Sequence, residues 1–400
     1  MNKEWMDAVT AMQPIEALTK EREALFACYE QLPHRKLPWH HQKPSPLTYT
    51  YDFFEETGEV YNFVDHDVAA LALTKEGDLV ATEVKSNTGI VVADLFQSLL
   101  NNEHLLSYFG QLMDKETKEG AFHYMTVNHG LFLYIPDQTV LKEPILLKGL
   151  LENIQATHVS HLLIIIGNHC QVTINDDFSI QGDRTIHRVT EVYVGNDTTL
   201  SYIRHCKGKN TGQHHDEFVM RLAKNSICHY DGLYHVEEDG FFVTRFHLEK
   251  EGARLIGHEV AIAKDNAKLY FNTEIVHCVK HTDSQWLSRG VAFGHSRLYF
   301  NAMSRIKEQA TGANALQNIQ LLLMDEQSQG EANPMLDICH HEVKASHGAV
   351  IRQMDEATRY YLMSRGLTKE EADALYVEGL LKEYVPQELH SEVKEALSFV

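Results

Sequence analysis

The sequence has few cysteines, and their spacing matches no common metal or disulfide pattern. Six cysteines are scattered over 400 residues, without a single Cys-x-x-Cys pair. This spacing excludes a zinc knuckle and does not suggest a disulfide framework. We therefore expect reduced thiols.

Long apolar runs and an excess of positive charge are also absent. The longest aliphatic run, residues 162–167, is far too short to cross a bilayer, and the N-terminus carries acidic residues where a signal peptide needs basic ones. The formal net charge is -20, which argues against a nucleic-acid partner and against binding to an anionic membrane. We expect a soluble cytoplasmic protein.

Several common catalytic motifs are missing. The sequence has no phosphate-binding P-loop, no Gly-x-Ser-x-Gly elbow and no dinucleotide fingerprint, so no nucleotide site is expected on this chain. The two His-Glu pairs, at 258–259 and 341–342, lack a second histidine four residues after the first. Neither pair is therefore an HExxH zinc site.

Acidic residues remain as candidates for catalysis. Asp176 with Asp177, or the acidic run at 237–239, would suit the acid and base of a polysaccharide-cleaving enzyme. Most of these residues flank predicted turns, where acidic side chains are simply solvated, so we favour a structural role. For the same reason we assign the His-His-Asp run at 214–216 to a surface loop.

The first 120 residues mix helical and extended signals. Helical periodicity predicts helices over 1–32 and 92–113, a proline-rich loop is expected over 32–46, and short strands are expected at 48–53 and 80–84. We interpret residues 1–120 as a mixed, mainly helical N-terminal domain.

From residue 121 the pattern becomes repetitive. Short β-branched or aromatic runs alternate with Gly, Asn or Asp turns at intervals of about fourteen residues, with the turn signal near residue 280 missing. Segments 195–203, 251–259, 265–273 and 294–302 resemble one another. Because these units are too short for helical repeats, we predict a parallel β-solenoid over 121–350, with an antiparallel sandwich as the competing architecture.

The last fifty residues, 351–400, predict a helical C-terminal domain. Asp355 is placed to cap a first helix that ends at Gly366, and Thr368 with Glu371 forms a capping box for a second. Pro386 ends the second helix, and a third closes the chain. Such short amphipathic helices cannot form a core alone, so we expect them to pack on the solenoid or on a partner.

The densest set of metal-ligand side chains immediately precedes this tail. Cys339, His340, His341 and His347 fall within nine residues of a chain that has 25 histidines. In a straight strand Cys339, His341 and His347 share one face, but Cys339 and His347 would lie about 26 Å apart. On this reading His347 needs ligands from another strand or another chain.

The same stretch carries a family resemblance. Residues 344–384 read KASHGAVIRQMDEATRYYLMSRGLTKEEADALYVEGLLKEY and resemble the C-terminal signature of the SufB/SufD iron–sulfur cluster assembly family. Segments 131–147, 161–179 and 190–204 resemble the family's core repeats, and 32–47 resembles its N-terminal Trp-Pro segment. The Ser-His-Gly form of the motif is closer to the SufD branch than to the SufB branch.

The resemblance implies a non-enzymatic scaffold subunit built on a right-handed parallel β-helix. It implies a SufB-like paralogue as partner and a transient iron–sulfur cluster shared with that subunit, with His347 as the interface iron ligand. It also implies a SufC-like ATPase docked on the C-terminal helices, for which we single out Tyr360, Tyr361, Arg365, Gly366 and Leu367. Whether a flavin takes part in the whole complex is left open.

The sequence departs from the family pattern beside the histidine. Ala345 stands where the family often has a cysteine, and His341-Glu342 replaces an acidic pair. Cys339 and His341 are therefore candidate substitute ligands, against the alternative of ordinary structural residues. Two other functions are weighed: a carbohydrate-active β-helix enzyme using turn carboxylates, and a self-sufficient metal-binding homodimer.

Overall fold

A computed structural model describes most of the chain. The described residues are 3–35, 62–64, 69–71, 73–75, 78–80, 89–127, 129–154, 158–182, 185–210, 212–237 and 239–398. The proline-rich loop beyond Arg35, the strand expected at 48–53 and most of the one expected at 80–84 lie outside them. Among the described residues, no helix has the length and apolar character needed to cross a membrane.

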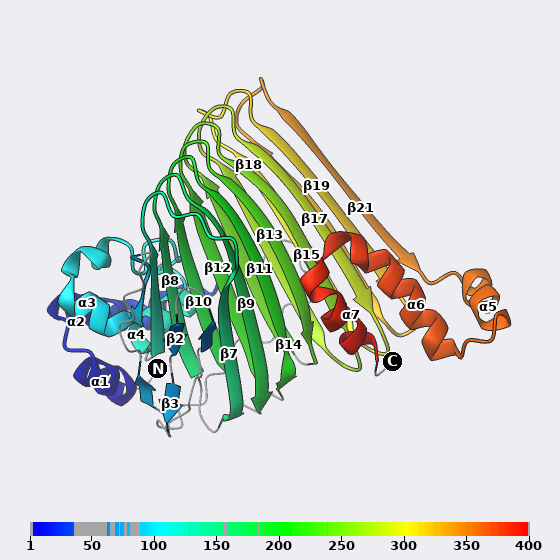
Figure 1. Cartoon of the computed structure of the whole chain (residues 1–400), viewed down its shortest axis with the longest axis horizontal. Coiled ribbons are helices and arrows are strands. Elements are labelled where there is room, and N and C mark those ends of the chain that lie inside the picture. The colour runs from blue at the N-terminus through cyan, green and yellow to red at the C-terminus, as the bar shows by residue number, and fades with distance from the viewer. Residues whose placement is uncertain are drawn as a thin grey trace.

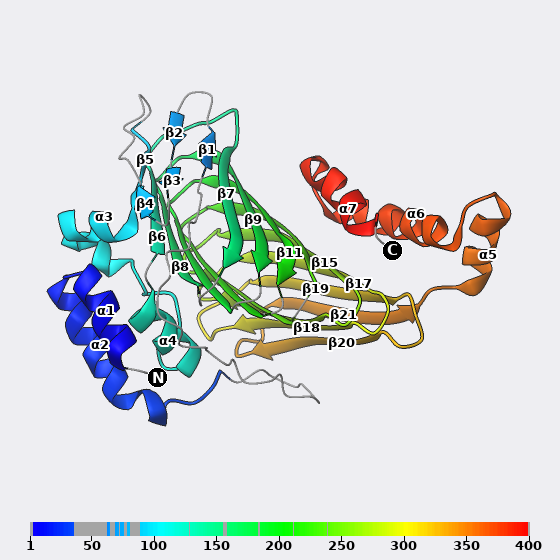
Figure 2. The ribbon, with the colours of Figure 1, turned by 90° about the horizontal axis from the view of Figure 1, so that it is seen from below.

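Two β-sheets face each other, and the chain passes from one to the other at every corner (Figures 1 and 2). In the described part, the ten-stranded sheet contains, in spatial order, β2 (Ala69–Leu71), β1 (Asn62–Val64), β7 (Ile145–Ile154), β9 (Gln171–Gly182), β11 (Thr199–Asn210), β13 (Ile227–Val236), β15 (Arg254–Ala263), β17 (Asp283–Ala292), β19 (Asn314–Leu323) and β21 (Lys344–Gln353). The nine-stranded sheet contains β20 (Gln329–Ile338), β18 (Arg297–Ile306), β16 (Lys268–His277), β14 (Asp239–Leu248), β12 (Gln213–Leu222), β10 (Ile186–Val194), β8 (His158–Ile166), β6 (His129–Ile135) and β5 (Val91–Asp94). A separate pair is formed by β3 (Leu73–Lys75) and β4 (Asp78–Val80).

The strands from β6 to β21 pair in parallel with the strand two places along the chain. Ile186 pairs with His214 and Thr199 with Ile227, a separation of 28 residues, or two of the predicted units of about fourteen. Two strands therefore make one coil. The predicted parallel solenoid is confirmed, and the antiparallel sandwich is wrong.

The internal repeat arises because equivalent side chains stack from coil to coil. In the two most similar segments, Tyr270 lies in register with Tyr299, and their rings stack at 4.6 Å between centroids. Asn301 Nδ2 donates to Asn272 Oδ1 at 2.8 Å in the same pair of strands. The same residue type recurs at equivalent positions because tyrosine rings that stack, and asparagine amides that hydrogen-bond, stabilise the pairing of one coil with the next.

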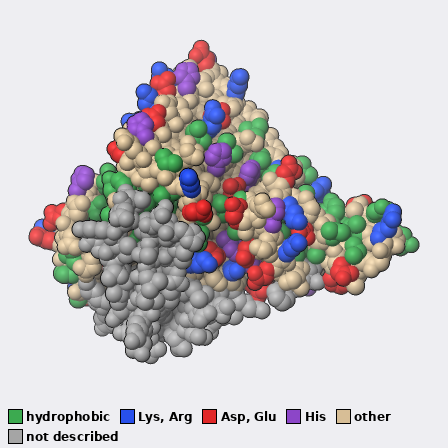
Figure 3. All heavy atoms as spheres, viewed as in Figure 1, with side chains coloured by type: hydrophobic (Ala, Val, Ile, Leu, Met, Phe, Trp, Pro, Cys, Tyr) green, Lys and Arg blue, Asp and Glu red, His purple; other side chains and the backbone are tan. Residues whose placement is uncertain are grey.

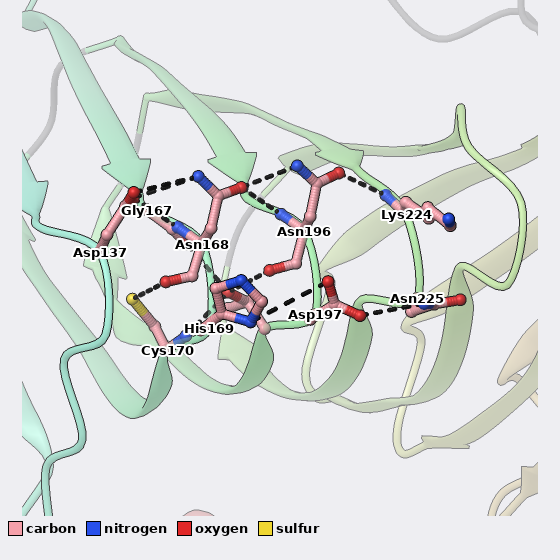
Figure 4. Close-up of polar contacts among 10 residues, drawn as sticks. Asp137, Gly167, Asn168, His169, Cys170, Asn196, Asp197, Lys224 and Asn225 are labelled. Atoms are coloured by element: carbon pink, nitrogen blue, oxygen red, sulfur yellow. Dashed lines mark hydrogen bonds and ion pairs between the residues drawn. The ribbon is translucent and has the colours of Figure 1, made fainter.

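One corner of the solenoid is held by a ladder of asparagine side chains (Figure 4). Asn168 N donates to Asp137 Oδ1 at 2.7 Å, Asn196 N donates to Asn168 Oδ1 at 2.8 Å, and Lys224 N donates to Asn196 Oδ1 at 3.1 Å. A left-handed φ of 52° to 58° follows in these corners at His169, Asp197 and Asn225. At the corner where the sequence signal was missing, His281 takes this conformation.

Charged pairs are buried inside the solenoid. The run at 214–216 lies within β12 and is buried, so its assignment to a surface loop is wrong. Arg204 donates two hydrogen bonds of 2.7 Å to the Asp216 carboxylate. Burial alone would raise the pKa of Asp216, but Arg204 and its neighbours hold that pKa below its ordinary value. The run at 214–216 can be buried because Arg204, on the preceding strand β11, supplies the charge opposite to that of Asp216.

The N-terminal helices pack on the outer face of the nine-stranded sheet, where their apolar residues meet Val159, Leu163 and Val189. They are α1 (Lys3–Met12), α2 (Glu16–Cys28), η1 (Tyr29–Gln31), α3 (Leu95–Asn101), η2 (Glu103–Ser107) and α4 (Lys118–Thr126). The helix predicted over 92–113 is wrong in extent, because Asp94 caps a shorter helix and Gly110 has a left-handed φ of 67°.

The C-terminal helices confirm the predicted caps and the predicted packing on the solenoid. They are α5 (Glu356–Ser364), α6 (Lys369–Leu381), η3 (Lys382–Tyr384), η4 (Gln387–Leu389) and α7 (His390–Leu397). Asp355 caps α5, and Thr368 with Glu371 forms the capping box of α6. Helices α6 and α7 cover the outer face of the ten-stranded sheet, whereas α5 extends beyond it (Figures 1 and 2).

Arg359 joins α5 to the rest of the molecule. Its Nε donates to Asp373 Oδ1 on α6 at 2.7 Å, and its Nη2 donates to the carbonyl oxygen of Met324, in a corner of the solenoid, at 2.9 Å. We expect Arg359→Met to leave the buried Asp373 carboxylate unpaired and to destabilise this junction by roughly 3–5 kcal/mol. Hydrogen exchange of the α5 and α6 amides should then be faster, and adding Asp373→Leu should restore most of the protection. Unchanged exchange in the single variant would contradict the role of this contact.

Glu259 is a buried carboxyl group on the inner face of β15. Thr273 Oγ1 and Ser288 Oγ each lie 3.3 Å from a carboxyl oxygen, and burial raises the pKa of Glu259 to about 8 from an ordinary value of 4.5. The folded protein thus keeps a proton that the unfolded chain loses.

This proton makes stability depend on pH. Between pH 4.5 and pH 8 the folded state binds more protons at Glu259 than the unfolded state, so the free energy of unfolding should fall as pH rises. Glu259→Gln stays neutral and should remove this fall, gaining roughly 2–4 kcal/mol over wild type at pH 8 and little at pH 5. Denaturant unfolding at both pH values measures it. The same pH dependence in both proteins would contradict a protonated Glu259.

Candidate functional site at the open end of the solenoid

Within the described residues, no further coil covers the last one. Strand β21 is the last strand of the ten-stranded sheet, and β20 is the last of the nine-stranded sheet. Strands of the preceding coils pair on both sides, whereas in the described part of the chain each of these two pairs on one side only. Two ten-residue edges are therefore open to pairing with another chain.

His347 lies on this open end. It is in register with Gln317 of β19, which is buried and donates a hydrogen bond to the carbonyl oxygen of Met335. Because parallel partners share a face, His347 occupies the same inward-facing position one strand further on. His347 is exposed, since no coil lies over it.

The straight-strand interpretation of residues 339–347 is wrong. Strand β20 ends at Ile338, residues 339–343 form a corner, and β21 begins at Lys344. The corner continues the stack of earlier corners, in which the Gly312 N–H donates to the carbonyl oxygen of Glu342 at 2.7 Å. Because the chain bends here, the separation of about 26 Å expected in a straight strand does not apply to Cys339 and His347.

The corner leaves Cys339 and His341 exposed. The His341 ring stacks on His340 at 5.0 Å, and His340 is held on both nitrogens: Nε2 lies 3.0 Å from Thr311 Oγ1, and Nδ1 accepts a 3.0 Å hydrogen bond from the Glu342 N–H. Cys339, His341 and His347 do not form a set whose ligand atoms all lie within 4.8 Å of one another. A metal centre here would need ligands from another chain.

A second exposed surface lies on α5. Tyr360 is 76% exposed and Tyr361 is 56% exposed, and the Arg365 Nη2 donates to the Tyr361 hydroxyl at 3.0 Å. Gly366 has a φ of 97°, which suits the glycine predicted at this helix end, and Leu367 follows half-buried. Met363 of α5 and Leu375 of α6 are also exposed. Hydrophobic side chains are visible on the end of the molecule formed by α5 (Figures 1 and 3).

Asp176 and Asp177, the first pair of carboxylates considered for catalysis, are not brought together, and Glu238 of the second candidate run at 237–239 lies outside the described residues. Asp176 faces the interior, where Arg188 Nη2 donates to it at 2.6 Å, while Asp177 faces outward with its Oδ1 3.0 Å from His205 Nδ1. Adjacent residues of a strand point to opposite faces, so these two do not share a groove.

The structure also shows a grouping that the sequence did not reveal. His205 on β11, His235 on β13 and Glu392 on α7 have ligand atoms that all lie within 4.8 Å of one another. The two histidines differ by one coil of 28 residues plus two, which places both on the outer face. The spacing of the two histidines could have been recognised in the sequence. Glu392 could not have been assigned to the same group, because it lies far from both histidines along the chain.

Comparison with known proteins finds a matching family model and related proteins. Residues 150–380 match the family model described as SUF system FeS cluster assembly, SufBD core domain. The chain is 27% identical over 355 residues to the iron-sulfur cluster assembly protein SufD of Bacillus subtilis (strain 168), covering 86% of this chain and 79% of that protein. It is 21% identical over 327 residues to an iron-sulfur cluster assembly SufBD family protein of Staphylococcus epidermidis (strain ATCC 12228 / FDA PCI 1200), covering 78% and 69%.

The family model spans more than half of the chain and covers most of the coils, the open end, helix α5 and nearly all of α6. The chain therefore belongs to the SufB/SufD family of the SUF system for iron–sulfur cluster assembly, as a SufD-like member.

Proposed function

We propose that this chain is a scaffold subunit for iron–sulfur cluster assembly in the cytoplasm, working in a complex with a SufB-like paralogue and a SufC-like ATPase. The observation that carries the proposal is the position of His347, exposed at an inward-facing position of the last coil, over which the described part of the chain places no further coil. A subunit that pairs with β20 and β21 would enclose this imidazole at the interface. The nascent cluster is cargo in this scheme.

The chemistry of the open end favours shared ligation. Imidazole suits iron, and an iron–sulfur cluster also needs thiolates. Ala345, the inward-facing neighbour of His347 on β21, offers none, and Cys339 lies on the corner. We assign the missing thiolate to the SufB-like partner, with Cys339 and His341 as supplementary ligands from this chain.

The SufC-like ATPase is assigned to the exposed surface of α5 formed by Tyr360, Tyr361, Arg365, Gly366 and Leu367. Exposed aromatic and arginine side chains are typical anchors of protein interfaces. Helix α5 follows β21 after only Met354 and Asp355. Movement of a bound ATPase would therefore be transmitted directly to the strand that carries His347.

The ligand role of His347 predicts a loss of cluster. His347→Ala, in a complex co-expressed with its SufB-like and SufC-like partners and purified without oxygen, should hold at least about tenfold less iron and sulfide. This expectation follows because losing a ligand should cost more than losing an outer-sphere contact. Elemental iron and acid-labile sulfide analysis measures the change.

His295→Ala is the matched control, because His295 is an exposed histidine in a different corner. It should retain the wild-type iron and sulfide. Undiminished cluster in His347→Ala, with all subunits present, would overturn the ligand assignment.

The docking surface predicts weaker ATPase binding. Replacing both Tyr360 and Tyr361 by alanine should weaken the affinity for the SufC-like ATPase at least tenfold, as expected when interface aromatic anchors are truncated. Titration calorimetry with the purified ATPase measures it. Lys394→Ala, which changes an exposed side chain of α7, is the control and should bind as wild type. Equal affinity of the double variant would show that the ATPase binds elsewhere.

A further inference from the structure

Two histidines and one glutamate meet where α7 covers the ten-stranded sheet. His205 Nε2 lies 2.9 Å from His235 Nε2 and 3.8 Å from Glu392 Oε2. Ligands of one metal ion at 2.0–2.2 Å from the metal are roughly 3–3.5 Å apart in tetrahedral geometry. The three groups are thus already close to the spacing that one ion requires.

Asp177 orients the first of these imidazoles. Its Oδ1 lies 3.0 Å from His205 Nδ1. When a metal binds His205 Nε2, a carboxylate at this distance can accept the Nδ1 proton, which is the usual outer-sphere arrangement of a metal-bound histidine.

His235 presents its own nitrogen to the same point. Its Nε2 lies 2.9 Å from His205 Nε2, and an imidazole nitrogen is a common metal ligand. The two rings are nearly parallel, at 28°, with their centroids 5.1 Å apart.

Lys207 is the cation now next to Glu392. Its Nζ lies 2.9 Å from Glu392 Oε2 and 3.8 Å from Glu395 Oε2. A carboxylate has several lone pairs on two oxygens, so Glu392 can keep Lys207 on one oxygen and present the other. Glu395 also offers Lys207 a second partner.

We propose that His205, His235 and Glu392 bind one divalent transition-metal ion of the zinc or ferrous iron class, with a fourth position open to water. Two imidazoles and a carboxylate suit these ions. The site is separate from the open end and does not depend on the function proposed for His347.

The ion would clip α7 to the solenoid. The helix already packs through buried Val393, Ala396 and Leu397, but its polar face meets the sheet through Glu392. A bond from the metal to Glu392 joins chain segments almost 190 residues apart. Metal binding should therefore slow the opening of the C-terminal helices.

The test uses the full chain, stripped of metal with chelator and titrated with Co²⁺ as a spectroscopic probe, followed by competition with Zn²⁺. Wild type should bind one Co²⁺ with visible d–d absorption. His235→Ala and Glu392→Gln should bind at least tenfold more weakly. Asp177→Asn, which changes a positioning residue, should lose about 10- to 100-fold in affinity.

His258→Ala is the matched control. His258 lies on β15, with its Nδ1 2.7 Å from Asp231 Oδ1, and resembles the Asp177–His205 pair but belongs to no such three-ligand group among the described residues. It should bind Co²⁺ like wild type. Circular dichroism and the unfolding midpoint of the metal-free protein check that each variant is folded. Glu392→Gln changes the shape of the side chain least, so it is the variant expected to disturb folding least.

The second readout is hydrogen exchange. Zn²⁺ should slow exchange of the α7 amides in wild type and leave Glu392→Gln unaffected. Three results would overturn the proposal: no Co²⁺ bound by wild type, unchanged affinity in both His235→Ala and Glu392→Gln, or unchanged affinity in Glu392→Gln alone, which would leave α7 outside the site. Cluster content of the assembled complex tests His347 separately.

Discussion

Stacking of one coil on the next is the constraint on which this molecule depends. The inner apolar face of each coil is covered by the facing sheet and by the coils on either side, so the column of matched side chains continues from one coil to the next. In the described part of the chain, the last coil is therefore covered on one side only. A solenoid of this kind ends in strands with one unpaired edge, and His347 lies on such a strand because β21 is the final one.

The two sets of terminal helices cover apolar side chains on the outer faces of the two sheets. The N-terminal helices cover the nine-stranded sheet near its first coils, and α6 with α7 covers the ten-stranded sheet. Their positions leave the open end free. They also place α5 directly after β21, so that a partner bound on α5 and a partner bound on the edge strands would act on the same segment of chain (Figure 1).

Much of the fold could be predicted because local patterns and coil stacking agree. The capping residues Asp355 and Thr368 mark helix starts through contacts within three residues, and both are found where expected. The prediction of one helix over 92–113 was wrong. Apolar residues at helical spacing also occur where a strand, a short helix and a 3₁₀ turn follow one another, as they do here. The corner at 339–343 was mistaken for strand because it lacks a glycine or asparagine.

The sequence by itself determined the repeat, its period, the helical ends and the family motif around His347. Each of these depends on residues that are neighbours in the chain or that recur at a fixed interval. Only the tertiary structure decided that Asp216 is buried against Arg204 and that His205 and His235 meet Glu392. Such contacts depend on the register between coils and on where α7 packs, and neither is encoded within a local stretch of sequence.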